Sequence, residues 1–99
     1  MNFTDIIELD VSAEALILNT TSEDINSIIK IKDNEIPQLK IKKEAILFFT
    51  VHDNIENPIK PEFTINIYTI NNYLIEFILE SDNREKLKEL KEYIVSILI

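Results

Sequence analysis

The chain has 99 residues, of which 45% are apolar, and this is enough for one folded domain over residues 1–99 with a real hydrophobic core. It contains no glycine and no cysteine, which excludes glycine-rich phosphate loops, EF-hand loops, disulfide bonds, thiol catalysis and cysteine-ligated zinc. The formal net charge is −8 without a basic cluster, which argues against direct binding to nucleic acids or to anionic membranes.

The same features bear on the compartment. The longest apolar run, residues 45–49, is far too short to cross a bilayer, and the chain does not start with a charged and then apolar leader. A chain without cysteine also fits a reducing environment. We therefore expect a cytoplasmic protein.

The N-terminal part favours two strands. Apolar and acidic side chains alternate from Ile7 to Val11, and a short apolar run follows, so residues 3–20 predict two strands joined near residues 11–14. A short helix capped by Ser12 is the alternative interpretation, because alanine, glutamate and leucine are good helix formers.

The middle of the chain contains several breaks. Residues 21–32 mix the helical and strand periods, which predicts a short helical turn that leads into a strand. Pro37 excludes a central strand at its own position, because proline has no N–H to donate. Residues 45–51 are apolar on both faces of any strand, so we expect the central, doubly covered strand there. Residues 53–61, rich in asparagine and proline, predict a long loop.

A hairpin is predicted over residues 63–80, where apolar and polar side chains alternate. A three-residue loop over residues 70–72 sets Ile67 opposite Ile75, whereas a two-residue loop sets apolar side chains opposite polar ones. We prefer the longer loop, with Asn72 in the left-handed backbone region that asparagine tolerates better than most residues.

The C-terminal residues 82–98 predict an amphipathic helix. Ser81 or Asp82 is the expected N-cap, with Glu85 completing a capping box after Asp82. An apolar stripe with helical spacing predicts the buried face, formed by Leu87, Leu90, Ile94 and Ile97.

These elements define an α+β fold, with a single antiparallel sheet of five to seven strands packed by a C-terminal amphipathic helix. The order of strands followed by one terminal helix resembles the pleckstrin-homology-like superfold, in which a bent antiparallel sheet is closed at one end by such a helix. Lipid-binding members of that superfold carry basic residues in the first hairpin loop, whereas residues 10–14 here are acidic. The resemblance therefore implies a domain that does not bind phosphoinositides.

Residues that could carry catalysis are few. His52 is the only histidine, and its neighbour Asp53 would point to the opposite face of a strand, so we expect a surface or structural role for this histidine. Two carboxylate pairs are candidate metal ligands, but Glu76 and Glu80 lie too far apart on a strand, and Asp53 and Glu56 lack further ligands. We expect no enzyme, no metal and no cofactor.

The acidic N-terminal third is the candidate partner-binding surface, because residues 1–29 contain no lysine or arginine. Its proposed contact residues are Asp5, Glu8, Asp10 and Glu14. We expect a non-enzymatic protein that binds another protein, as a small acidic inhibitor or immunity-type factor that occupies a basic or nucleic-acid-binding surface.

Two alternatives remain open. The acidic residues could simply keep an edge strand soluble, or the chain could be an adaptor or assembly domain that binds a protein through a sheet edge or the 53–61 loop. The sequence does not specify the oligomeric state.

Overall fold

The computed structural model describes residues 3–99, which form eight strands and one α-helix in two antiparallel sheets. The elements are β1 (Ile7–Asp10), β2 (Ala15–Asn19), β3 (Asn26–Ile31), β4 (Asn34–Ile36), β5 (Gln38–Lys42), a 3-10 turn (Lys43–Ala45), β6 (Ile46–Asn54), β7 (Glu62–Thr69), β8 (Leu74–Glu80) and α1 (Arg84–Leu98). The α+β class and the antiparallel pairing are confirmed, but the prediction of a single sheet with five to seven strands is wrong.

One sheet has three strands in the order β1-β2-β5, and the other has five in the order β4-β3-β8-β7-β6. The chain passes from the larger sheet to the smaller one at Pro37, between the last residue of β4 and the first residue of β5. A proline cannot donate a ladder hydrogen bond, so the ladder breaks and the chain turns there. The prediction that no strand continues through Pro37 is confirmed.

The N-terminal hairpin is confirmed, since β1 pairs with β2 and Ile7 lies opposite Leu18. The helical turn expected within residues 21–32 is wrong, because residues 23–25 are a bend that leads directly into β3. Ile25, one of the residues that suggested a helical face, is buried in the core without any helix around it.

The β7–β8 hairpin has the predicted register, with Ile67 opposite Ile75. Its loop spans residues 70–72, and Asn72 adopts a positive φ of 66°, as predicted. The side-chain oxygen of Thr69 accepts a hydrogen bond from the Tyr73 backbone N–H at 3.0 Å, which fixes the two ends of the loop. Local sequence therefore determines this hairpin.

Helix α1 begins two residues later than predicted. Asn83 is the N-cap and accepts a hydrogen bond from the Lys86 N–H at 3.1 Å, so the assignment of Ser81 or Asp82 is wrong. Ser81 instead accepts a hydrogen bond from the Asn83 N–H, which shapes the turn before the helix. The predicted apolar face is confirmed at its three buried positions, Leu87, Leu90 and Ile94.

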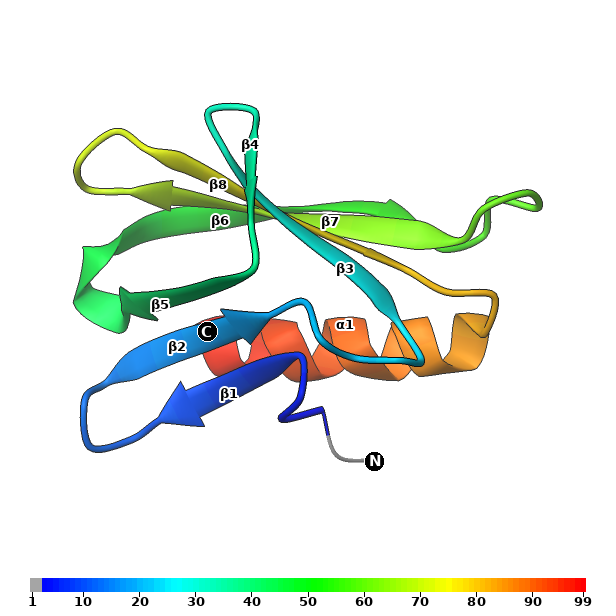
Figure 1. Cartoon of the computed structure of the whole chain (residues 1–99), viewed down its shortest axis with the longest axis horizontal. Coiled ribbons are helices and arrows are strands. Elements are labelled where there is room, and N and C mark those ends of the chain that lie inside the picture. The colour runs from blue at the N-terminus through cyan, green and yellow to red at the C-terminus, as the bar shows by residue number, and fades with distance from the viewer. Residues whose placement is uncertain (1–2) are drawn as a thin grey trace.

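The core is one cluster enclosed by the two sheets and the helix. In Figure 1 the helix lies below the five-stranded sheet, at the level of β1 and β2. The inward faces of β7 and β8 supply much of the core, through Phe63, Ile65, Ile67, Ile75, Phe77 and Leu79. Phe3 is buried in the same cluster, with its ring centroid 5.7 Å from that of Tyr93 on α1.

Strand β6 differs most from expectation. The sequence predicts a central strand covered on both faces at residues 45–51, but β6 is the last strand of the five-stranded sheet and pairs only with β7. Seven of its nine residues are exposed and none is buried. This prediction is wrong because β3 pairs with β8, which places β7 and β8 inside the sheet and leaves β6 at its edge.

Candidate functional site

The two sheets have four edge strands, and three of these edges are protected against pairing with another chain. β4 has only three residues and β1 only four, and short strands offer few backbone groups for pairing. Charge or proline adds to this protection through Glu8 and Asp10 on β1, Pro37 directly after β4, and Lys40 and Lys42 on β5.

The edge of β6 lacks that protection. It is nine residues long and contains no proline and no lysine, and Asp53 is its only formally charged residue. Within residues 3–99 no strand pairs with its outer side. A long apolar strand with unpaired backbone N–H and C=O groups is a template for a further strand. The β6 edge, residues 46–54, is therefore the candidate functional site.

Apolar side chains are exposed along the first six residues of this edge. Leu47 is 63% exposed, Phe48 49% and Val51 37%. A register shift between Ile46 and Phe48 leaves Leu47 without a cross-strand neighbour. Phe48 stacks on Tyr68 of β7 with ring centroids 4.4 Å apart and planes 14° from parallel. The outer face of the edge thus presents a fixed aromatic surface.

Two open hollows flank this aromatic pair. One, of about 280 Å³, is lined by Lys43, the first four residues of β6 and Leu98 at the end of the helix. The other, of about 270 Å³, lies between β6 and the β7–β8 loop and is lined by Leu47, Phe48, Tyr68, Thr69, Asn72, Tyr73 and Leu74. These hollows could accept the side chains of a segment that pairs with β6.

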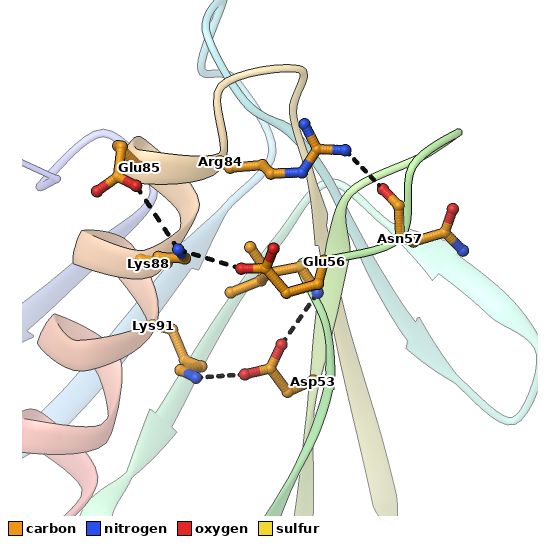
Figure 2. A network of polar contacts seen from close by, with 8 residues as sticks. Asp53, Glu56, Asn57, Arg84, Glu85, Lys88 and Lys91 are labelled. Carbon is orange, nitrogen blue, oxygen red and sulfur yellow. Dashed lines mark hydrogen bonds and ion pairs between the residues drawn. The ribbon is translucent and has the colours of Figure 1, made fainter.

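The second half of β6 is attached to the helix. Asp53 forms an ion pair with Lys91 and accepts a hydrogen bond from the Ile55 N–H at 3.0 Å. The hydrogen bond from Lys91 is the main cause that holds the pKa of the Asp53 carboxyl below its ordinary value. Figure 2 shows this carboxylate turned toward the helix. The Asp53 side chain therefore fixes the end of the strand.

The loop after β6 is held in the same way. Lys88 lies 3.1 Å from Glu56 and 3.6 Å from Glu85, and the Glu56 contact is the main cause that raises the Lys88 pKa. The Arg84 guanidinium donates a hydrogen bond to the Asn57 carbonyl at 2.9 Å (Figure 2). Ile55, the first residue after β6, is buried in the core. The predicted loop of residues 53–61 is shorter than expected, because residues 53 and 54 belong to β6. These contacts hold the remaining loop, residues 55–61, against α1, which leaves fewer of its groups for a partner.

The four acidic residues predicted to bind a partner lie along and beside β1. Asp5 precedes the strand, Glu8 is exposed on it, and Asp10 and Glu14 flank the turn to β2. Asp10 mainly serves this turn, since its carboxylate accepts hydrogen bonds from the Ser12 hydroxyl at 2.8 Å and from the Ala13 N–H at 3.2 Å. Its partner-binding role, like that of the other three, stays a prediction.

Basic side chains reduce the negative charge of the surface that these four residues form. Lys40 of β5 lies 3.2 Å from Asp10, and the pairing of β2 with both neighbours puts Lys40 in the same cross-strand row as Glu8. The pKa of Asp10 is lowered, first by the Ser12 hydrogen bond and then by Ala13 and Lys40. The three-stranded sheet therefore has mixed charge where the sequence suggested a purely negative patch.

A second acidic group lines a hollow of about 330 Å³ between the β2–β3 connection and the start of the helix. Two of its four carboxylates form ion pairs within the chain. Asp24 lies 2.6 Å from Lys86, and Glu80 lies 2.9 Å from Lys60, a contact that lowers the Glu80 pKa. Across residues 3–99 no group of three or more histidine, cysteine, aspartate or glutamate side chains is arranged to hold a metal ion.

The residues of the β6 edge were missed because the same apolar pattern suits a buried strand and an exposed edge. Leu47, Phe48 and Val51 give no local signal that separates the two. The one available hint is Asp53-Asn54 at the end of the strand, since a strand buried on both faces seldom ends in several exposed polar residues.

Comparison with known protein families, with curated protein sequences and with solved structures finds no match to this chain. Of the residues that the structure describes, none belongs to a helix with the length and apolar character needed to cross a membrane. The site must therefore be interpreted from its own geometry.

Proposed function

We propose that this chain is a non-enzymatic protein-binding domain that takes up an extended segment of protein along the β6 edge. A single observation supports this function: within residues 3–99, β6 is the longest of the four edge strands of the two sheets, and Asp53 at its far end is its only formally charged residue. In this mode of binding the main-chain hydrogen bonds supply affinity, and alternate side chains of the added strand supply specificity. The chain would then act as an adaptor or assembly domain.

The exposed residues of β6 indicate which side chains and which backbone conformation the bound segment should have. Its side chains beside Phe48 and Val51 would be apolar, because these two residues are exposed on opposite faces of the strand. Its backbone would be extended and free of proline where it meets Thr50 at the middle of β6. The middle of the edge carries no charge, so the strand pairing around Thr50 should be insensitive to salt.

A capture experiment tests this function. The tagged chain and its variants are incubated with extract from the native cell, and bound proteins are identified by mass spectrometry. Thr50→Lys places a charge on the β6 edge, whereas Thr64→Lys places the same charge on the interior strand β7 of the same sheet. We expect a partner that is lost with Thr50→Lys and retained with Thr64→Lys. Equal recovery with both variants would exclude the edge as the binding site.

The acidic inhibitor remains the second candidate. It is supported by the exposure of Asp5, Glu8 and Glu14, none of which forms an ion pair within residues 3–99. Such a protein would occupy a basic or nucleic-acid-binding surface of its partner. In the same capture experiment, loss of the partner with Glu8→Lys but not with Thr50→Lys would favour this candidate over the edge.

The remaining parts of the proposal concern fold family and compartment. The position of α1 directly after the last strand supports the resemblance to the pleckstrin-homology-like superfold, here without lipid binding. The absence of cysteine supports a cytoplasmic location. Localisation of a fluorescent fusion in the native cell tests the compartment, and titration with phosphoinositide vesicles tests the absence of lipid binding.

A further inference from the structure

We infer that the occupant of the β6 edge is a second copy of this chain, paired antiparallel along β6 so that two five-stranded sheets become one sheet of ten strands. This inference rests on the proposed function, because it names the partner for the same edge. Three properties of β6 support it: its length, the order of its side chains and the charges at its two ends.

The first property is the length of β6, because it determines the register in which two copies of the strand can pair over all their residues. β6 runs over residues 46–54, so antiparallel pairing of its full length with a second β6 places Thr50 opposite Thr50 at the two-fold axis. All nine residues of each strand then have a neighbour. Cross-strand threonine pairs are favourable in antiparallel sheets.

The second property is the order of side chains around that axis. In this register Phe49 of each copy lies opposite Val51 of the other, on the face where their β7 neighbours Ile67 and Ile65 are buried. The core faces of the two sheets thus lie on the same side, and the apolar surface continues across the axis. On the outer face, Phe48 lies opposite His52, which extends the ring stack on Tyr68.

The third property is charge. Lys42 and Lys43 precede β6, together with Glu44, and neither lysine has an ion-pair partner within residues 3–99. Glu62, opposite Asn54 at the other end of the strand, also has none, whereas Asp53 is paired with Lys91 of its own chain. Antiparallel pairing places the basic end of each copy beside the acidic end of the other, so the dimer contains two equivalent contacts of this kind. A parallel arrangement would instead bring like charges together, so the charges favour the antiparallel one.

The oligomeric state tests the inference first. Sedimentation velocity of the wild-type chain over a range of concentrations should show a monomer–dimer equilibrium. Thr50→Lys places two lysines opposite each other at the axis, so it should weaken the dimer by at least about 100-fold. Thr64→Lys, with the same charge change on an interior strand, should leave the dimer unchanged.

Engineered cysteines then test the register, and the natural absence of cysteine makes every cross-link assignable. Thr50→Cys should form an inter-chain disulfide under mild oxidation, because directly opposed residues have suitable Cβ separations. A mixture of Phe48→Cys and His52→Cys proteins should cross-link to each other more than either cross-links to itself.

Any of three results would overturn the inference: a wild-type chain that stays monomeric at all concentrations, a dimer that persists in Thr50→Lys, or a dimer that fails to cross-link through Thr50→Cys. A different result would contradict the proposed function. A monomeric wild-type chain that still loses its partner with Thr50→Lys would contradict only the self-pairing, whereas a partner retained by Thr50→Lys would contradict binding at the edge.

Discussion

Strand β6 and the β7–β8 hairpin have similar apolar content and opposite exposure. Alternate residues of β7 and β8 are buried, among them Phe63 and Phe77 with no exposed surface, whereas β6 buries none of its residues and leaves Phe48 49% exposed. Both regions belong to the same sheet, so the difference comes from position in the strand order. Apolar composition alone therefore does not identify the core of this chain.

The two regions also differ in whether their apolar side chains are already covered within the chain. The alternating hairpin faces the helix and needs no partner, because its apolar face is already covered by Leu87, Leu90 and Ile94. β6 has apolar side chains and backbone groups that nothing within residues 3–99 covers on its outer side. We expect substitutions in the first region to change folding and substitutions in the second to change association.

The largest expected effect comes from placing a charge in each region. Leu90→Asp buries an unpaired carboxylate and should lower the free energy of unfolding by about 4 kcal/mol. The matched variant Leu47→Asp changes a 63% exposed residue and should lower it by less than about 1 kcal/mol. Urea unfolding at neutral pH measures both. Similar losses in the two variants would contradict the difference in burial.

An intermediate effect is expected at the hairpin loop. Asn72 has a φ of 66°, a region that β-branched residues avoid, so Asn72→Val should destabilise the fold by about 1–2 kcal/mol. Asn72→Gly keeps the allowed conformation and should change stability by less than about 0.5 kcal/mol. Thermal unfolding of the two variants is the measurement, and a valine variant as stable as the glycine variant would argue against the left-handed conformation.

The smallest effect concerns the contact between Asp53 and Lys91. Because the folded-state pKa of Asp53 is lowered, its contribution to stability is present above the pKa of the unfolded carboxyl and is lost as pH falls through the folded value. Asp53→Asn should cost less than about 1 kcal/mol at pH 7, because the pair is partly exposed. The difference from wild type should shrink as pH falls below about 4. A difference that does not vary with pH in urea titrations would contradict the ion pair.

The parts of the fold that follow from neighbouring residues were predictable. The alternation within residues 63–80 determines the β7–β8 register, the helical spacing of Leu87, Leu90 and Ile94 determines the buried face of α1, and Pro37 marks a break between strands. In each case the physical cause acts within one element or one loop, so the sequence pattern contains it.

Pairings between distant segments were not predictable in this way. Ile29 of β3 pairs with Phe77 of β8, and Leu16 of β2 pairs with Ile41 of β5, but no local period contains these partners. The first pairing gives β8 its inner position and leaves β6 at the edge, while the second creates the separate three-stranded sheet. The choice of N-cap failed for a related reason, since Ser81, Asp82 and Asn83 can all cap and the path of the chain after β8 decides among them.

The candidate site was predictable only in part. The possibility of a sheet edge followed from the expected fold class, but the edge could not be assigned before the strand order was known. The structural role of Asp10 could have been predicted from the sequence. An aspartate side chain often accepts hydrogen bonds from residues that follow it in a turn, as Asp10 does here from Ser12 and Ala13. Its pairing with Lys40 depends on the distant strand β5 and could not be foreseen.

Amide hydrogen exchange of the wild-type chain tests the central claim most directly, because it reports on each backbone N–H of β6. In dilute protein, we expect alternate amides of residues 46–54 to exchange fast, while those of β7 and β8 exchange slowly. The fast amides should become protected as the protein concentration rises. If every β6 amide were as protected as those of β7 in dilute protein, the edge would be covered and the account would be contradicted.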